Sequence, residues 1–187
     1  MDPSKESPGV DKEKISQEIL ARCEKDQEMR KRWSESGFNA EFYDAELDVE
    51  NQEYIKKVVE QLGGWPKISE FGEDVPEALW VMVQHVPDTE LQKEMVTAMQ
   101  QLPAEEVIQK NVAKTIDRIR IREGKRQLYG TSFNIDNNTQ VLTVDPIEDE
   151  EHIDERRAAM GMDSFAAQKE RAFKSYQEHL DKLAAEK

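Results

Sequence analysis

His85 is the residue in this sequence best suited to proton transfer, because of where it stands in its expected helix. It closes an apolar segment, residues 76–85, that we expect to form a helix ending before Pro87. The carbonyl groups left free at a helix C-terminus favour a cationic imidazole and offer one ring nitrogen a partner. A histidine in that position suits general acid or base catalysis. The alternative interpretation is a structural histidine that caps those carbonyls.

Asp117 and Arg118 are a second candidate, a charged pair at the edge of the apolar stripe of an expected helix over residues 104–123. A partly buried carboxylate beside an arginine stays ionised and can orient a histidine or bind a substrate cation. The neighbouring guanidinium can hold a carboxylate or phosphate through two hydrogen bonds. The alternative is an ordinary charged helix flank, the interpretation we also give to Asp26 and Arg30, four residues apart on the first expected helix.

A polar row on an expected β-hairpin is the third candidate. Two β-rich segments, residues 126–135 and 140–147, flank a cluster of Asp and Asn and therefore predict a hairpin. Alternation along the first strand places Gln127, Tyr129 and Thr131 on one face. That face offers an amide, a phenol and a hydroxyl group to a ligand. The alternative is an edge strand with one solvated face.

The elements that position these residues are expected to be mainly helical. Apolar residues recur at helical spacing in seven segments, at about 11–37, 48–62, 76–85, 88–102, 104–123, 150–160 and from 164 onward. Asp11, Asp48 and Asp88 are the expected N-caps of the first, second and fourth helices. We predict a mainly α fold: a mobile tail over residues 1–10, then one compact domain over 11–187 with a buried central helix and a hairpin at about 126–147.

Charge and cysteine content limit the classes of function. The chain has 187 residues, 26 basic and 40 acidic, and a net charge of −14. This field repels nucleic acid and anionic lipid, so we expect neither as a partner. No apolar run is long enough for a membrane span, and residues 1–14 lack the apolar core of a secretory signal. One cysteine suits a reducing compartment, so a cytoplasmic protein is expected.

Neither a metal nor a cofactor is expected from the sequence motifs. His85, His152 and His179 are scattered, there is no HExxH motif, and a single cysteine cannot build a thiolate site. The chain also lacks a GxGxxG segment, a P-loop and a GxSxG nucleophile elbow.

The order and spacing of several polar motifs resemble an uncharacterised bacterial family, a domain of unknown function, over roughly residues 15–165. The motifs of that family are GWP, then QH, then DR, then Q-x-YGTQ. The matching residues here are Asp26, Gln27, Arg30, Asp48, Asn51, Gly64–Pro66, Gly72, Gln84, His85, Gln92, Asp117, Arg118, Gly124, Gln127, Tyr129–Thr131, Pro146, Ile147, Arg156, Arg157 and Gly161. The resemblance supplies no reaction, but it implies that these polar residues converge on a pocket.

This sequence departs from the family motif at Ser132, which replaces the glutamine of YGTQ. By strand alternation Ser132 faces away from Tyr129 and Thr131. We therefore expect altered support or entry of the pocket, with the polar row retained.

The hypothesis that unites these candidates is an enzyme that performs metal-free acid/base chemistry on a small polar molecule or a peptide. His85 is the expected general acid/base, Asp117 orients it or a substrate amine, and Tyr129 is a second proton donor. The expected substrate contacts are Arg118, with Arg157 or Arg30, for an anionic group, Gln84, Gln127 and Thr131 for positioning, and Trp65 as an apolar wall.

The alternative hypothesis is a non-enzymatic binding protein, similar to an immunity or inhibitor protein. A small acidic helical chain suits a basic protein partner, because long-range attraction speeds their encounter. The QH, DR and YGT residues would then form a buried network that stabilises the fold.

Overall fold

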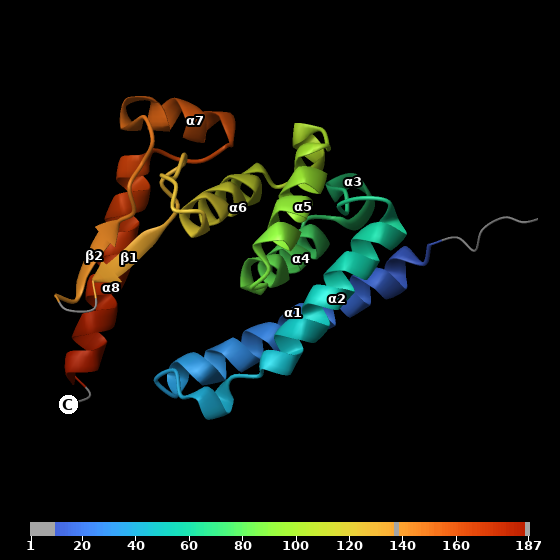
Figure 1. Cartoon of the computed structure of the whole chain (residues 1–187), viewed down its shortest axis with the longest axis horizontal. Coiled ribbons are helices and arrows are strands. Elements are labelled where there is room, and N and C mark those ends of the chain that lie inside the picture. The colour runs from blue at the N-terminus through green and yellow to red at the C-terminus, as the bar shows by residue number, and fades with distance from the viewer. Residues whose placement is uncertain (1–9, 137–138, 186–187) are drawn as a thin grey trace, which may run out of the picture. The chain divides into compact units, whose positions relative to one another are not determined.

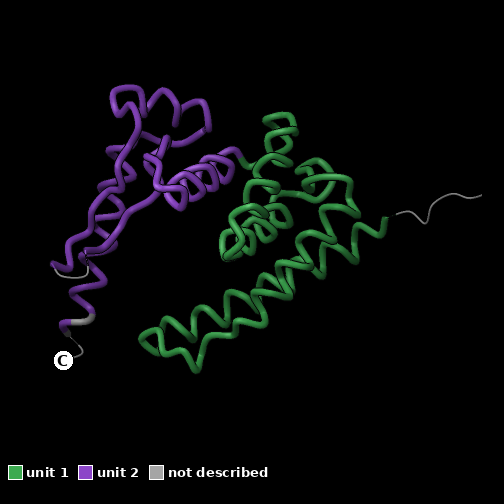
Figure 2. The backbone as a smooth tube through the Cα atoms, in the orientation of Figure 1, with its two compact units in different colours: residues 1–108 green, residues 109–187 purple. Residues whose placement is uncertain are grey.

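The computed structural model describes residues 10–136 and 139–185. Within these residues the fold is mainly α, with eight α-helices and one two-stranded antiparallel sheet, which confirms the predicted fold class. The predicted mobile tail, residues 1–10, lies outside the described residues except for Val10, and so do residues 137 and 138 of the hairpin turn. The chain divides into two compact units, which we call unit 1 and unit 2, at residues 108 and 109 (Figure 2).

The regular secondary structure in the described part of unit 1 is entirely helical. Its elements are α1 (Lys12–Glu35), η1 (Ala40–Phe42), α2 (Ala45–Leu62), α3 (Ile68–Phe71), α4 (Asp74–His85), α5 (Thr89–Gln100) and η2 (Ala104–Glu106). Figure 1 shows α1 and α2 side by side in opposite directions, and α4 contacts both of them. Leu79 and Val83 of α4 are fully buried, so the predicted apolar helix lies in the core. It ends at His85, as Pro87 predicts.

The helix caps explain where the helices of unit 1 begin. The Asp11 carboxylate accepts from the Lys14 N–H at 3.0 Å, and that of Asp88 accepts from the Glu90 N–H at 2.9 Å, which confirms both predicted caps. The prediction that Asp48 caps α2 is wrong. Asp44 is the cap, accepting from the Leu47 N–H at 3.0 Å. Asp48 therefore lies inside the first turn, where its side chain is buried and available for other contacts.

Unit 2 combines three α-helices with the hairpin. Its elements are α6 (Gln109–Arg122), β1 (Phe133–Asp136), β2 (Val141–Val144), η3 (Glu150–His152), α7 (Ile153–Ala159) and α8 (Phe165–Ala185). The strands pair antiparallel, from Phe133 opposite Val144 to Asp136 opposite Val141. The helix predicted over 104–123 begins only at Gln109, because residues 104–106 form a separate 3-10 turn after Pro103.

The first strand is shorter than the sequence predicts. Residues 128–132 form a loop, and Gln127 makes only an isolated bridge to Ile147. Gly130 has a φ of +65°, a left-handed conformation that interrupts a strand. Gln127, Tyr129 and Thr131 therefore do not form one face of a strand.

Gly130 is expected to be the position in this loop least tolerant of a side chain. A Cβ there would lie 2.7 Å from the Phe165 ring and 2.9 Å from Ile153 Cδ1, in addition to the strain of the positive φ. We expect Gly130→Ala to lower the free energy of unfolding by about 3 kcal/mol, measured by urea denaturation. The matched control is Gly124→Ala, which has a φ of +72° and open space at its Cβ, and should cost only about 1 kcal/mol. Equal losses for the two variants would contradict the steric explanation.

Candidate functional site

His85 is paired with a buried carboxylate from another helix. Its Nδ1 lies 2.7 Å from Oδ2 of Asp26, which stands in the middle of α1. Asp26 is fully buried, whereas 26% of the His85 side chain is exposed. With an ionised Asp26, Nδ1 carries the hydrogen and donates it. Nε2 then has no hydrogen-bond partner within the described part of the chain. The geometry thus gives an oriented imidazole with one nitrogen available.

Asp26 is held in its ionised form by several neighbours. Its burial opposes ionisation, but the hydrogen bond and charge of His85, the charge of Arg30 and a hydrogen bond from Gln27 together lower its pKa. Arg30 Nε donates to Oδ1 at 3.2 Å and Gln27 Nε2 donates to Oδ2 at 2.9 Å. Asp26 is therefore a carboxylate at neutral pH.

Arg30 extends this network to the start of α2. Its guanidinium donates to one oxygen of Asp48, and the Tyr43 hydroxyl donates to the other. The hydrogen bond to Asp48 is the main cause that raises the pKa of Tyr43, and burial is the second. We call Asp26, Gln27, Arg30, Tyr43, Asp48 and His85 the His85 network.

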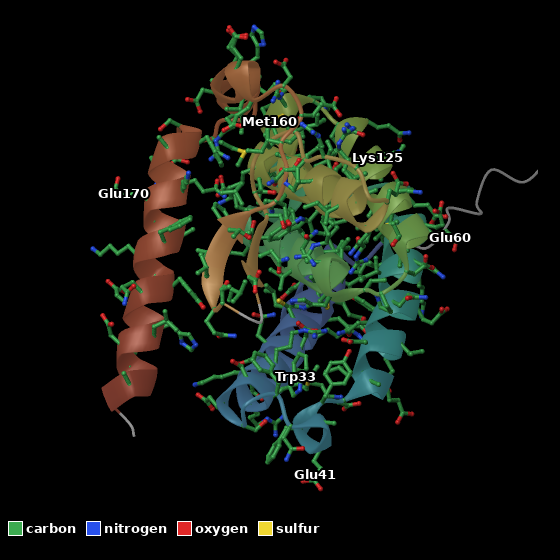
Figure 3. The ribbon with its side chains drawn as sticks, turned by 60° about the vertical axis from the view of Figure 1, so that its left-hand side comes forward. Trp33, Glu41, Glu60, Lys125, Met160 and Glu170 are labelled. Carbon is green, nitrogen blue, oxygen red and sulfur yellow. The ribbon has the colours of Figure 1, made fainter. Side chains whose placement is uncertain are left out.

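The far end of the His85 network borders a cavity at the turn between α1 and α2. The cavity has a volume of about 400 Å³ and is lined by Tyr43 with, among others, Lys25, Met29 and Phe42. Figure 3 shows Trp33 and Glu41 at this turn, at the opposite end of α2 from Glu60. The network thus runs from the exposed edge of His85 to a second solvent-accessible region.

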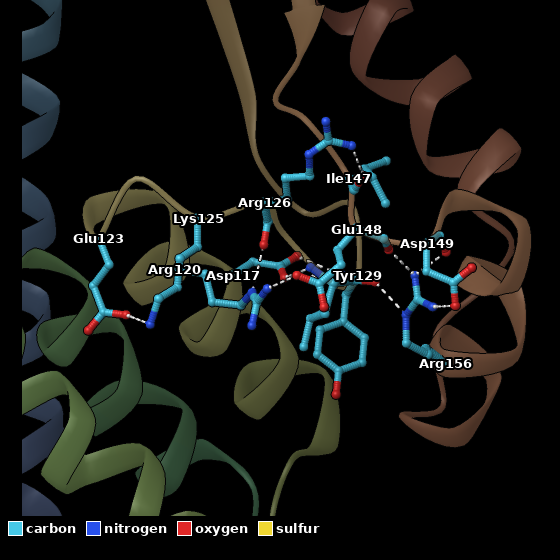
Figure 4. A network of polar contacts seen from close by, with 11 residues as sticks. Asp117, Arg120, Glu123, Lys125, Arg126, Tyr129, Ile147, Glu148, Asp149 and Arg156 are labelled. Carbon is cyan, nitrogen blue, oxygen red and sulfur yellow. Dashed lines mark hydrogen bonds and ion pairs between the residues drawn. The ribbon is translucent and has the colours of Figure 1, made fainter.

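Asp117 in unit 2 makes a different kind of contact. It is fully buried on α6, and its oxygens accept from the backbone N–H groups of Leu128 at 2.6 Å, Tyr129 at 3.1 Å and Thr131 at 3.1 Å. The Thr131 hydroxyl donates to it as well, at 2.9 Å. Figure 4 shows Asp117 within a polar network that includes Arg120, Tyr129 and Arg156. The carboxylate fixes the conformation of the loop formed by residues 128–132.

Gln127 and Arg157 also bind backbone groups of unit 2, and both are fully buried. Gln127 Nε2 donates to the carbonyls of Ser132 and Asp145, and its Oε1 accepts from the Ser132 N–H. Arg157 donates to the carbonyls of Tyr129 and Asp163. The Ser132 hydroxyl donates to the Asp145 carboxylate at 2.7 Å. These side chains hold the loop and the base of the hairpin together.

The Tyr129 phenol points out of this loop. Figure 4 shows its ring extending away from Asp117 and Arg156, although its backbone N–H is bound to Asp117. Its hydroxyl makes no hydrogen bond to any residue that the structure describes. Burial and the charge of Asp117 raise its pKa, so at neutral pH it is a proton donor.

The candidate residues are divided between the two units. Unit 1 contains Arg30, Trp65, Gln84 and His85, and unit 2 contains Asp117, Arg118, Gln127, Tyr129, Thr131 and Arg157. In unit 1, Asp26 joins Arg30 to His85; Trp65 is only 3% exposed and Gln84 only 6%. In unit 2, Asp117 joins Tyr129 to Thr131, and Arg118 is exposed on α6. That both sets share one pocket stays a prediction.

Sequence reasoning did not identify Asp26 as the partner of His85. The available signal was the spacing of Asp26 and Arg30 together with their place among the polar motifs. A pair of opposite charges four residues apart is, however, also typical of a solvated helix face. The sequence predicts Asp48 as a helix cap, and Tyr43 belongs to none of the motifs.

Within residues 10–136 and 139–185, no group of three or more His, Cys, Asp or Glu side chains could hold a metal ion, and no helix is long and apolar enough to cross a membrane.

Comparison with known proteins identifies a family without a described activity. No curated protein and no solved structure gives a significant match to the chain. One family model does match, over residues 13–173. Because this match covers most of the chain, the protein belongs to the family of unknown function DUF6624, and the family membership predicted from the motifs is confirmed.

Proposed function

We propose that the protein is an enzyme that performs acid/base chemistry on a small polar molecule or a peptide, with His85 as the proton-transferring group. The observation that carries this proposal is the pairing of a fully buried carboxylate with a partly exposed imidazole. We assign the orienting role to Asp26, since it lies 2.7 Å from Nδ1 of His85. Such a pair is a recurrent arrangement for a general base.

The chemistry follows from which nitrogen carries the hydrogen. Asp26 accepts the Nδ1 hydrogen, so the lone pair of Nε2 is available to take a proton from a substrate or from water. The imidazolium that forms is stabilised by the Asp26 carboxylate, which itself stays ionised. Arg30 and Gln27 hold Asp26 in place by hydrogen bonds to its two oxygens.

A second candidate function is the acidic binding protein, and a separate observation favours it. Asp117, Gln127 and Arg157 direct their hydrogen bonds to backbone groups of unit 2, as members of a structural network do. With a net charge of −14, such a protein would attract a basic partner. This function predicts that substitution of His85 alters no chemical activity.

The deciding experiment is an unbiased search for turnover. The purified protein is incubated with a pool of small polar metabolites and short peptides, and the mixture is compared by mass spectrometry with pools given His85→Gln or His152→Gln. His152 is the matched control, because it also pairs with an aspartate, Asp149, but on an exposed surface.

We expect at least one compound to be converted by the wild type and by His152→Gln, and not by His85→Gln. Loss of one general base lowers a rate by about 10²–10⁴-fold, which this assay resolves. Conversion that survives in His85→Gln contradicts the assignment of His85. A pool left unchanged by the wild type contradicts enzymatic activity and favours the binding protein.

A further inference from the structure

The interface between α1 and α2 contains a row of polar residues that passes directly by the Asp26–His85 pair. Arg30 of α1 binds Asp48 of α2, and the Arg22 guanidinium carbon lies 4.4 Å from the centre of the Tyr54 ring. These two contacts fix how the antiparallel helices align. They lie eight residues apart on α1 and six apart on α2, so each helix has one residue midway between them.

The residues at these midpoints are Asp26 on α1 and Asn51 on α2. Asp26 and Asn51 therefore stand at the same level of the interface, on the faces that the two helices turn toward one another. His85 joins this level from α4 through its 2.7 Å contact with Asp26. Three helices thus each bring one polar residue to the same layer of unit 1.

Asn51 differs from its neighbours because its amide is buried without a hydrogen-bond partner. The residue is 2% exposed, and neither Nδ2 nor Oδ1 has a hydrogen-bond partner among the described residues. A buried polar group without a partner destabilises a fold, so this position carries a cost that an apolar side chain would avoid. A water molecule can supply both the acceptor that Nδ2 lacks and the donor that Oδ1 lacks.

The nearby thiol is unsuited to act as the nucleophile. Cys23 lies one turn before Asp26 on α1, and burial, the charge of Asp26 and the charge of Glu77 raise its pKa to about 11. It is therefore a neutral thiol at physiological pH, and a thiolate is the reactive form of cysteine. Cys23 therefore does not supply a nucleophile to this layer.

We propose that Asn51 holds the water molecule that attacks the substrate, so that the reaction at His85 is hydrolysis of an ester or amide. This inference rests on the proposed function of His85. The water oxygen forms a bond to the carbonyl carbon while Nε2 of His85 takes one water proton. The bond to the leaving oxygen or nitrogen then breaks, and that atom departs with the bonding electrons and receives the proton back from the imidazolium.

The test combines a measurement without substrate and one with it. In the 15N-labelled protein, a nuclear Overhauser cross-peak between the Asn51 side-chain amide and a long-lived water reports the water directly. In H2(18)O, the compound converted in the metabolite and peptide search is expected to give a product that contains one heavy oxygen from solvent. The variants are Asn51→Leu, which removes the amide at similar volume, and Tyr54→Phe, which removes the neighbouring unpaired hydroxyl as a control.

We expect the water cross-peak in the wild type, heavy oxygen in the product, and a rate about 10²-fold lower in Asn51→Leu, with Tyr54→Phe close to the wild type. Asn51→Leu should unfold at a urea concentration no lower than the wild type, because an apolar side chain of similar volume replaces a buried amide that makes no hydrogen bond to the described protein residues. Asn51→Val, which is smaller than the leucine variant and also removes the amide, gives the same comparison if the leucine variant does not fold.

Three outcomes overturn this inference while His85 keeps its role: no cross-peak, no heavy oxygen in the product, or an unchanged rate in the Asn51 variant. An unchanged rate together with a cross-peak identifies a structural water. If the wild type converts nothing, the proposed function fails and hydrolysis fails with it.

Discussion

Replacing Asp117 with alanine is expected to lower the free energy of unfolding of unit 2 by about 3–5 kcal/mol. The carboxylate is fully buried and accepts from three backbone N–H groups and one hydroxyl of the loop, residues 128–132. Alanine leaves all four donors without their acceptor, and each unsatisfied donor away from water costs about 1–3 kcal/mol. The loop then loses its conformation.

This loss is best measured locally. Hydrogen exchange followed by mass spectrometry should show the Leu128, Tyr129 and Thr131 amides losing protection in Asp117→Ala, and circular dichroism in urea gives the global effect. Thr131→Val is the matched control: it removes only the hydroxyl donor and should cost about 1 kcal/mol, with the three amides still protected. If these amides are equally protected in wild type and Asp117→Ala, the loop is held by something other than this carboxylate.

The parts of this fold that local chemistry determines are the parts that the sequence predicts. Asp11 and Asp88 cap their helices, Gly63 ends α2 in a left-handed conformation, and Pro87 limits α4, because each of these signals acts within a few residues. Asp48 shows the limit of that reasoning. Asp44 and Asp48 are equally good caps by residue type; in the structure Asp44 caps α2, whereas Asp48 binds Arg30 of α1 and Tyr43.

The candidate site depends on contacts that no local pattern encodes. Asp26 and His85 are 59 residues apart, so their pairing follows from the packing of α1 against α4. Strand alternation wrongly predicted that Gln127, Tyr129 and Thr131 share one face. The backbone around Gly130 binds Asp117, more than ten residues earlier, in place of a neighbouring strand. The polar motifs of the sequence include most of these residues, but a motif does not distinguish a residue that binds backbone from one that contacts a substrate.

The second large effect is expected for Asp26→Asn in unit 1, with a loss of about 3 kcal/mol at pH 7. The variant keeps the volume of the side chain but removes the negative charge that Arg30 and His85 bind. The loss should also depend on pH, because the pKa of Asp26 is lowered in the folded protein by those same partners, against the opposing effect of burial.

The sign of this dependence follows from the direction of the shift. A carboxyl group whose pKa is lowered by folding contributes its full stabilisation above its unfolded pKa of about 3.9, and loses it as the pH falls through the lower folded value. Asparagine does not titrate, so the difference in unfolding free energy between wild type and Asp26→Asn should be largest near pH 7 and shrink below about pH 4.

Tryptophan fluorescence in urea measures this difference in the correct unit, since Trp33, Trp65 and Trp80 all lie in unit 1. Asp44→Asn is the matched control, because asparagine also caps a helix and the change should have little effect at pH 7. A difference for Asp26→Asn that stays constant from pH 7 to pH 3 would mean that its charge is not what binds Arg30 and His85. A difference that falls with pH shows that the carboxylate stabilises unit 1 in the ionised form that a general base at His85 requires.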